Sequence, residues 1–203
     1  MANTDNRFGL RLIPGRRAYS LRKVLVASTY ATDVFVGDAL TRATTAISNA
    51  SEITTAVGKY GIGSLESAIR VTPGTGNGIL GVITAIDPLH GVADNYGRAS
   101  TARVVTICDD PQAEYEIQAE GSFSDTQVGL NAVIIDTHAG STISGLSGTE
   151  LDCGTTTAPA ADAAFQLTVK AVIDRADNEV GTNAKLRVRI NNNLNSNAIV
   201  GKA

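Results

Sequence analysis

The chain has 203 residues and a formal net charge of −3, with 43% hydrophobic and 18% charged residues. This length fits one domain, or one domain with an arm, and the apolar content excludes a wholly disordered chain. The negative charge argues against a nucleic-acid partner, because general nucleic-acid binders carry a basic face.

The first 20 residues combine basic and apolar side chains without a clear strand or helix period. Gly9, Pro14 and Gly15 interrupt the stretch, which favours an extended conformation. A purely solvated tail would not carry this much apolar surface, so we expect an extended N-terminal arm over 1–20 that docks on a partner. The side chains expected to make this contact are Arg7, Phe8, Leu10, Arg11, Ile13, Arg16 and Arg17.

A β-rich body is expected over 21–203, where short β-branched or alternating runs are separated by turns. A serine ahead of helix-forming residues predicts one short helical turn within 61–69. The stretch 140–159 is rich in Ser, Thr and Gly and predicts a surface loop. This pattern indicates an all-β fold, a β-sandwich or barrel or a jelly-roll-like domain with at most one or two short helices. The main expected strands are 23–27, 33–36, 79–86, 102–108, 114–118, 133–135, 165–173 and 184–190.

The clearest strand pair lies on either side of Asp109-Asp110-Pro111. This run predicts a turn, because proline fixes φ and aspartate caps the local backbone. In the strand that follows, Glu114 and Glu116 alternate with apolar residues, so we expect one packed and one solvated face. Two neighbouring carboxylates are also a glycosidase pattern, but sugar sites use aromatic platforms and the chain has no Trp. We therefore interpret both as solvated.

No catalytic, cofactor or metal site is expected from the sequence. His90 and His138 lie in predicted loops or strand ends without partners at ligand spacing, and we interpret them as exposed. No serine or cysteine stands in a nucleophile motif. Cys108 and Cys153 are interpreted as buried thiols, with a disulfide left open. No apolar stretch reaches the ~20 residues of a membrane span or forms a signal-peptide core, so neither a membrane partner nor secretion is expected.

Several segments form a series of motifs in a fixed order between about residues 7 and 191. They are 7–13, 34–40, 79–83, 102–111, 114–118, 128–131, 177–179 and 185–191. The most specific piece is the Asp-Asp-Pro turn that runs into Glu-Tyr-Glu-Ile-Gln. Together these segments resemble a family of capsid decoration (cement) proteins of tailed bacteriophages. The chain has Leu12-Ile13 where that family tends to have proline.

The resemblance implies a non-enzymatic virion protein that sits on the capsid outer surface and clamps major capsid subunits together. Such a protein is made in the host bacterial cytoplasm. Its implied partners are the major capsid protein and copies of itself, and a trimer is expected because a closed ring matches three-fold positions of a shell. The alternative is a non-catalytic receptor- or glycan-binding β-module of a head fibre or tail.

Overall fold

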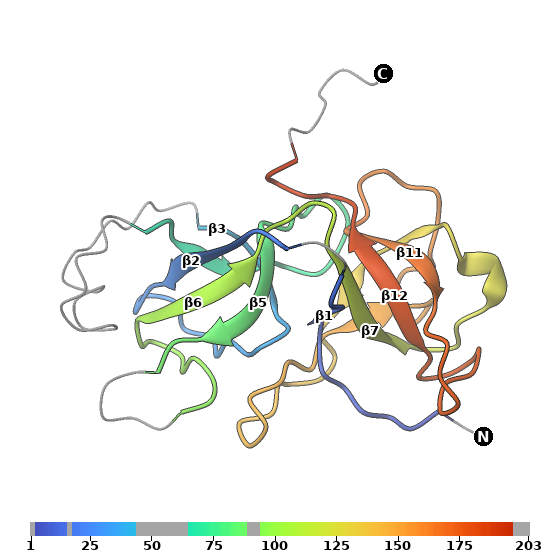
Figure 1. Ribbon diagram of the computed structural model, residues 1–203, viewed down its shortest axis with the longest axis horizontal. Helices are drawn as coiled ribbons and strands as arrows, with labels where there is room; N and C mark the ends of the chain where they lie inside the picture. Colours follow the sequence, from blue (N-terminus) through green and yellow to red (C-terminus); the bar gives the residue numbers. More distant parts are fainter. Residues whose placement is uncertain (1–2, 16–17, 44–64, 89–93, 197–203) are drawn as a thin grey trace.

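The structure is a computed structural model that describes residues 3–15, 18–43, 65–88 and 94–196. Its regular elements are β-strands, apart from one short 3₁₀ turn, η1 (Asp125–Gln127), which confirms the expected all-β class. The strands form two sheets, seen to the left and right in Figure 1.

The smaller sheet has five strands in the spatial order β2-β6-β5-β3-β4. All of its neighbouring strands are antiparallel. The expected strands near 23–27, 79–86 and 102–108 are confirmed, and the turn before residue 114 joins this sheet to the larger one. The strands are β2 (Leu21–Val26), β3 (Ala39–Arg42), β4 (Ala68–Arg70), β5 (Gly81–Ile86) and β6 (Arg103–Cys108).

The larger sheet is built around β7. Strand β12 pairs with one edge of β7. Two strands share the other edge: β1 pairs antiparallel with the first part of β7, and β10 pairs parallel with its last part. The spatial order is β8-β11-β12-β7-β10-β9. The strands are β1 (Arg11–Leu12), β7 (Glu114–Glu120), β8 (Asn131–Ala132), β9 (Ile134–Ile135), β10 (Glu150–Asp152), β11 (Leu167–Val172) and β12 (Lys185–Ile190).

Most buried apolar side chains of the described residues belong to two hydrophobic cores, of which the first joins the two sheets. The first is shared by both sheets, because side chains of the larger sheet pack with side chains of the smaller one; it includes Val82, Cys108, Tyr115, Ile117, Leu151, Leu186 and Val188. The second core is made largely by the smaller sheet and includes Val24, Leu40, Ile83, Val105 and Ile107. Cys108 and Cys153 are buried free thiols, as expected, and burial raises the pKa of Cys153 to about 12.

Three predicted elements are wrong. The expected strand 33–36 forms only isolated bridges, at Val34 and Val36. Ala68 and Ile69, expected in a helical turn, belong instead to strand β4, where Ile69 lies opposite Thr41. The first residues of that turn, 61–64, lie outside the described residues. The predicted loop 140–159 contains strand β10, because Leu151 is fully buried beside β7 and β9.

The N-terminal segment, residues 3–15, runs along the larger sheet and reaches the junction of the two sheets at β1 (Figure 1). Phe8 and Leu10 are only 7% and 1% exposed. The Leu10 N–H donates to the Gly37 carbonyl at 2.9 Å, and the Ile13 N–H donates to the Glu114 carbonyl at 2.9 Å. The segment is extended, but it is part of the chain's own core, in contrast to an arm that stands apart from the body.

A close backbone crossing fixes this segment against the smaller sheet. Gly9 and Gly37 both have positive φ, +67° and +95°. A Cβ atom on Gly37 would lie 2.6 Å from the Phe8 carbonyl oxygen, and one on Gly9 would lie 2.7 Å from the Gly37 carbonyl oxygen. Side chains essentially never approach backbone atoms this closely, so only glycine fits at either position.

Candidate functional site

The polar face of β7 is covered rather than solvated. Glu116 is 5% exposed and Gln118 is 1% exposed, so the prediction of a solvated face is wrong at both positions. The physical reason is the N-terminal segment, which brings donors to this face: Arg11 pairs with Glu116, and the Asn6 N–H donates to the Gln118 side-chain oxygen at 2.8 Å. Arg175 pairs with the other oxygen of Glu116 at 2.8 Å.

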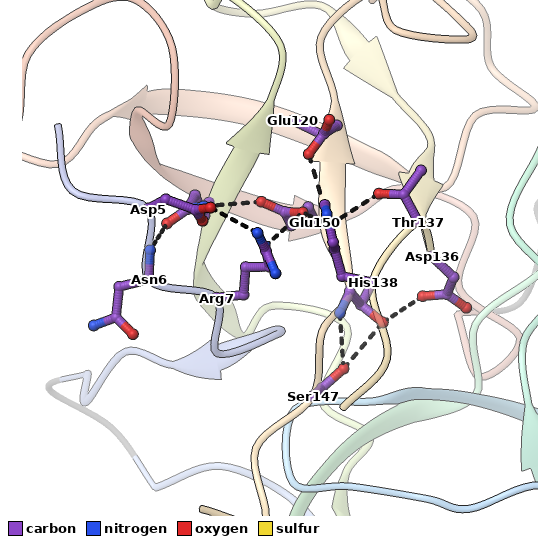
Figure 2. A network of polar contacts seen from close by, with 11 residues as sticks. Asp5, Asn6, Arg7, Glu120, Asp136, Thr137, His138, Ser147 and Glu150 are labelled. Carbon is purple, nitrogen blue, oxygen red and sulfur yellow. Dashed lines mark hydrogen bonds and ion pairs between the residues drawn. The ribbon is translucent and has the colours of Figure 1, made fainter. Parts of the chain in front are cut away.

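Three possible metal ligands meet farther along this face (Figure 2). Glu120 ends β7, Glu150 begins β10, and His138 lies in the loop between β9 and β10. Their donor atoms all lie within 4.8 Å of one another. His138 Nδ1 is 2.9 Å from Glu150 Oε2 and 3.9 Å from Glu120 Oε2. We call these residues the Glu120–His138–Glu150 cluster.

The buried carboxylate of this cluster is held from several sides (Figure 2). Gln118 Nε2 donates to Glu150 Oε1 at 2.9 Å and to Asp5 Oδ1 at 2.8 Å. Arg7 pairs with Asp5 at 2.6 Å, and its Nε lies 3.5 Å from Glu150 Oε2. Burial raises the pKa of Glu150, an effect opposed by the hydrogen bonds from His138 and Gln118 and reinforced by Glu120.

The interpretation of His138 as an exposed loop histidine is therefore wrong. Its side chain is one-third exposed and contacts the almost fully buried Glu150. The cluster was missed because no two of its members stand at a ligand spacing in the sequence. They meet only because β10 pairs in parallel with β7, placing Leu151 opposite Ala119. His90 lies outside the described residues.

A second polar network ties the smaller sheet to the β9–β10 loop. The Ser147 hydroxyl lies 2.5 Å from Asp38 Oδ1 and 3.0 Å from the Thr149 hydroxyl, which donates to Asp136 Oδ1 at 2.6 Å. Arg70 lies between the two aspartates, 3.2 Å from Asp38 and 2.9 Å from Asp136. Figure 2 shows the Asp136 and Ser147 end of this network.

Burial raises the pKa of Asp38 to about 6, despite opposing effects of Arg70, Ser147 and the Phe35 N–H. Since the folded state binds this proton more tightly than the unfolded state, the contribution of Asp38 to stability is greatest below pH 3.8. It is lost as the pH rises through about 6. The shift corresponds to about 3 kcal/mol.

This linkage predicts a pH-dependent difference between the wild type and Asp38→Asn. Urea unfolding at pH 4 to 7 should show the wild type losing about 3 kcal/mol relative to the variant across this range. Asp125→Asn, an exposed position in η1, is the control and should track the wild type. If the difference in the free energy of unfolding between the wild type and Asp38→Asn stays constant with pH, the raised pKa of Asp38 is contradicted.

An apolar pocket of about 370 Å³ opens beside the N-terminal segment. Leu146 of the β9–β10 loop is one of its lining residues and is 36% exposed. The Arg11 side chain is 55% exposed at the same place. We call this surface the N-terminal pocket; it is lined by Phe8, Leu10, Arg11, Leu12, Val36, Gly37, Ile83, Thr84 and Leu146.

The residues expected to contact a capsid divide into three groups. Phe8 and Leu10 are buried in the chain's own core, and Arg7 is paired with Asp5 and Glu150. Arg11 and Ile13 are not buried, and Arg11 lines the N-terminal pocket. Arg16 and Arg17 lie outside the described residues. The sequence analysis missed Leu146, which the β9–β10 loop brings to the N-terminal pocket.

Comparison with protein-family models, with curated proteins and with solved structures found no match to this chain. Among the described residues, no helix is long and apolar enough to cross a membrane.

Proposed function

We propose that the chain is a non-catalytic structural protein of a tailed-phage virion. It binds the outside of the capsid and stabilises contacts between major capsid subunits. One observation carries this proposal beyond the sequence: two of the segments that resemble decoration proteins, 7–13 and 34–40, are packed against each other in the fold. Their crossing at Gly9 and Gly37 forms part of the N-terminal pocket.

The N-terminal pocket is the surface that would meet a capsid subunit. It combines an apolar cavity with the partly exposed side chain of Leu146 and the half-exposed side chain of Arg11. Apolar anchors in pockets carry most of the binding energy of protein interfaces, whereas charges at the rim act mainly on rate and salt dependence. A capsid segment with an apolar side chain beside a carboxylate would fit this surface.

The proposal is tested by co-sedimentation with capsids assembled from a major capsid protein encoded in the same genome. Leu146→Asp should weaken attachment at least about tenfold, because it places an unpaired charge in the pocket. Arg11→Ala should weaken it less, and this effect should fade in high salt. Val128→Ser and Val180→Ser, at exposed apolar positions that do not line the pocket, are matched controls.

Wild-type protein that fails to sediment with these capsids at micromolar concentration would overturn the capsid proposal. Attachment that is unaffected by Leu146→Asp would keep a capsid role but move the interface elsewhere. The proposal includes self-association as a trimer, which repeats each weak contact three times and so raises avidity. The mass from sedimentation equilibrium measures this directly, and a monomer both free and capsid-bound would contradict it.

A further inference from the structure

We infer that the Glu120–His138–Glu150 cluster binds a divalent first-row cation, with Zn²⁺ as the best fit to its donors. Two carboxylates and one imidazole are a common donor set for this ion. This inference does not depend on a role in a capsid. It rests on the geometry, the charge and the support of the three side chains.

The geometry matches the spacing of ligands around one ion. Donor atoms about 2.0–2.1 Å from a tetrahedral Zn²⁺ lie about 3.4 Å from one another. The two measured separations from His138 Nδ1, 2.9 Å to Glu150 and 3.9 Å to Glu120, fall on either side of this value. Small movements of the Glu120 side chain, which is one-quarter exposed, are enough to bring all three donors to one ion.

The charge of the surroundings favours a divalent cation. Asp5, Glu120 and Glu150 carry three negative charges, and Arg7 carries one positive charge, which leaves −2 when His138 is neutral. Like-charged side chains on neighbouring strands repel each other unless a counter-charge lies between them. Arg7 is already paired with Asp5 at 2.6 Å, so it compensates Glu150 only in part.

The cluster is also supported by a second layer of contacts. Gln118 donates to Glu150 Oε1, which leaves Oε2 to face His138. Glu150 is 1% exposed and therefore held in place, whereas the side chains of Glu120 and His138 are 25% and 34% exposed. The partly open side gives an ion access from solvent and leaves room for water as a fourth ligand.

Titration of tag-free, EDTA-treated protein with Zn²⁺ at pH 7 tests the site by calorimetry. We expect one ion per chain with a Kd in the micromolar range or below. Zn²⁺ at 100 times Kd should raise Tm by about 5 °C or more, because an ion that binds only the folded state stabilises it. Bound Co²⁺ should give visible absorption bands typical of a metal site with a low coordination number. A cluster that is held only by hydrogen bonds and binds no metal would give no such bands.

Glu120→Gln and His138→Ala should each weaken Zn²⁺ binding at least about tenfold. Glu114→Gln, at an exposed carboxylate of the same strand, is the matched control and should bind as the wild type does. Wild-type protein that shows neither heat of binding nor Co²⁺ bands at 1 mM metal would overturn the inference, whatever the folding of the variants. Unchanged affinity in folded His138→Ala would overturn it as well.

Discussion

Deletion of residues 1–13 should leave a chain that no longer unfolds cooperatively. The deletion removes Phe8 and Leu10 from the core, strand β1 from the edge of β7, and the donors that face Glu116 and Gln118. Loss of one buried Phe or Leu side chain costs about 3–5 kcal/mol. Two such losses approach the whole stability of a typical domain, about 5–15 kcal/mol.

Far-UV circular dichroism and urea unfolding measure this effect. A full-length Phe8→Ala/Leu10→Ala double variant separates the loss of side chains from the loss of strand pairing, and it should lose about 6–10 kcal/mol. Arg11→Ala should lose less than about 1 kcal/mol, because its side chain is more than half exposed. A truncated chain with wild-type cooperativity would show that the segment is an independent arm after all.

Gly37→Ala should be strongly destabilising, and Gly129→Ala is its matched control. Gly37 and Gly129 both have positive φ, +95° and +87°, so alanine is strained at each by about 1–2 kcal/mol. Only at Gly37 would the new Cβ meet backbone, the Phe8 carbonyl oxygen at 2.6 Å; at Gly129 nothing lies within 4 Å.

The collision adds about 1–3 kcal/mol of overpacking, so Gly37→Ala should lose about 2–5 kcal/mol in total against about 1–2 for Gly129→Ala. Chemical unfolding of both variants gives the difference. Because the collision is with the N-terminal segment, amide hydrogen exchange should also rise at Leu10 and Ile13 in Gly37→Ala. If both variants lose the same stability, the backbone crossing of Gly9 and Gly37 can move apart without an energetic penalty, and the expected collision is contradicted.

The strands that could be predicted are those whose pattern is local. Strands β6 and β7 carry runs of alternating residues on either side of a proline turn, and both are present in the structure. Strands β1 and β10 have two and three residues, too few for a period to show. They exist because each pairs with β7 across a long stretch of chain, and no local signal encodes such a pairing.

The candidate sites could be predicted only in part for the same reason, because they depend on contacts between residues far apart in the sequence. The alternation of Glu116 with apolar neighbours was visible in the sequence, but the group that covers it, Arg11, lies more than a hundred residues away. His138 meets Glu150 only through the β7–β10 register. Phe8 and Leu10 were predicted to contact a capsid, but in the structure both are buried within the chain itself, because segment 7–13 packs against a strand more than a hundred residues away.

The long reach of β1 also sets the order in which the protein can be completed during synthesis. Arg11 lies opposite Glu116, and Leu12 opposite Tyr115, so β1 has no partner until β7 has left the ribosome. Closing such a long loop is slow, because its entropy is lost before the pairing is gained. Strand β1 is translated well before β7 and is therefore fixed in place late, and the apolar side chains beside it stay open to chaperones or to a neighbouring copy until then.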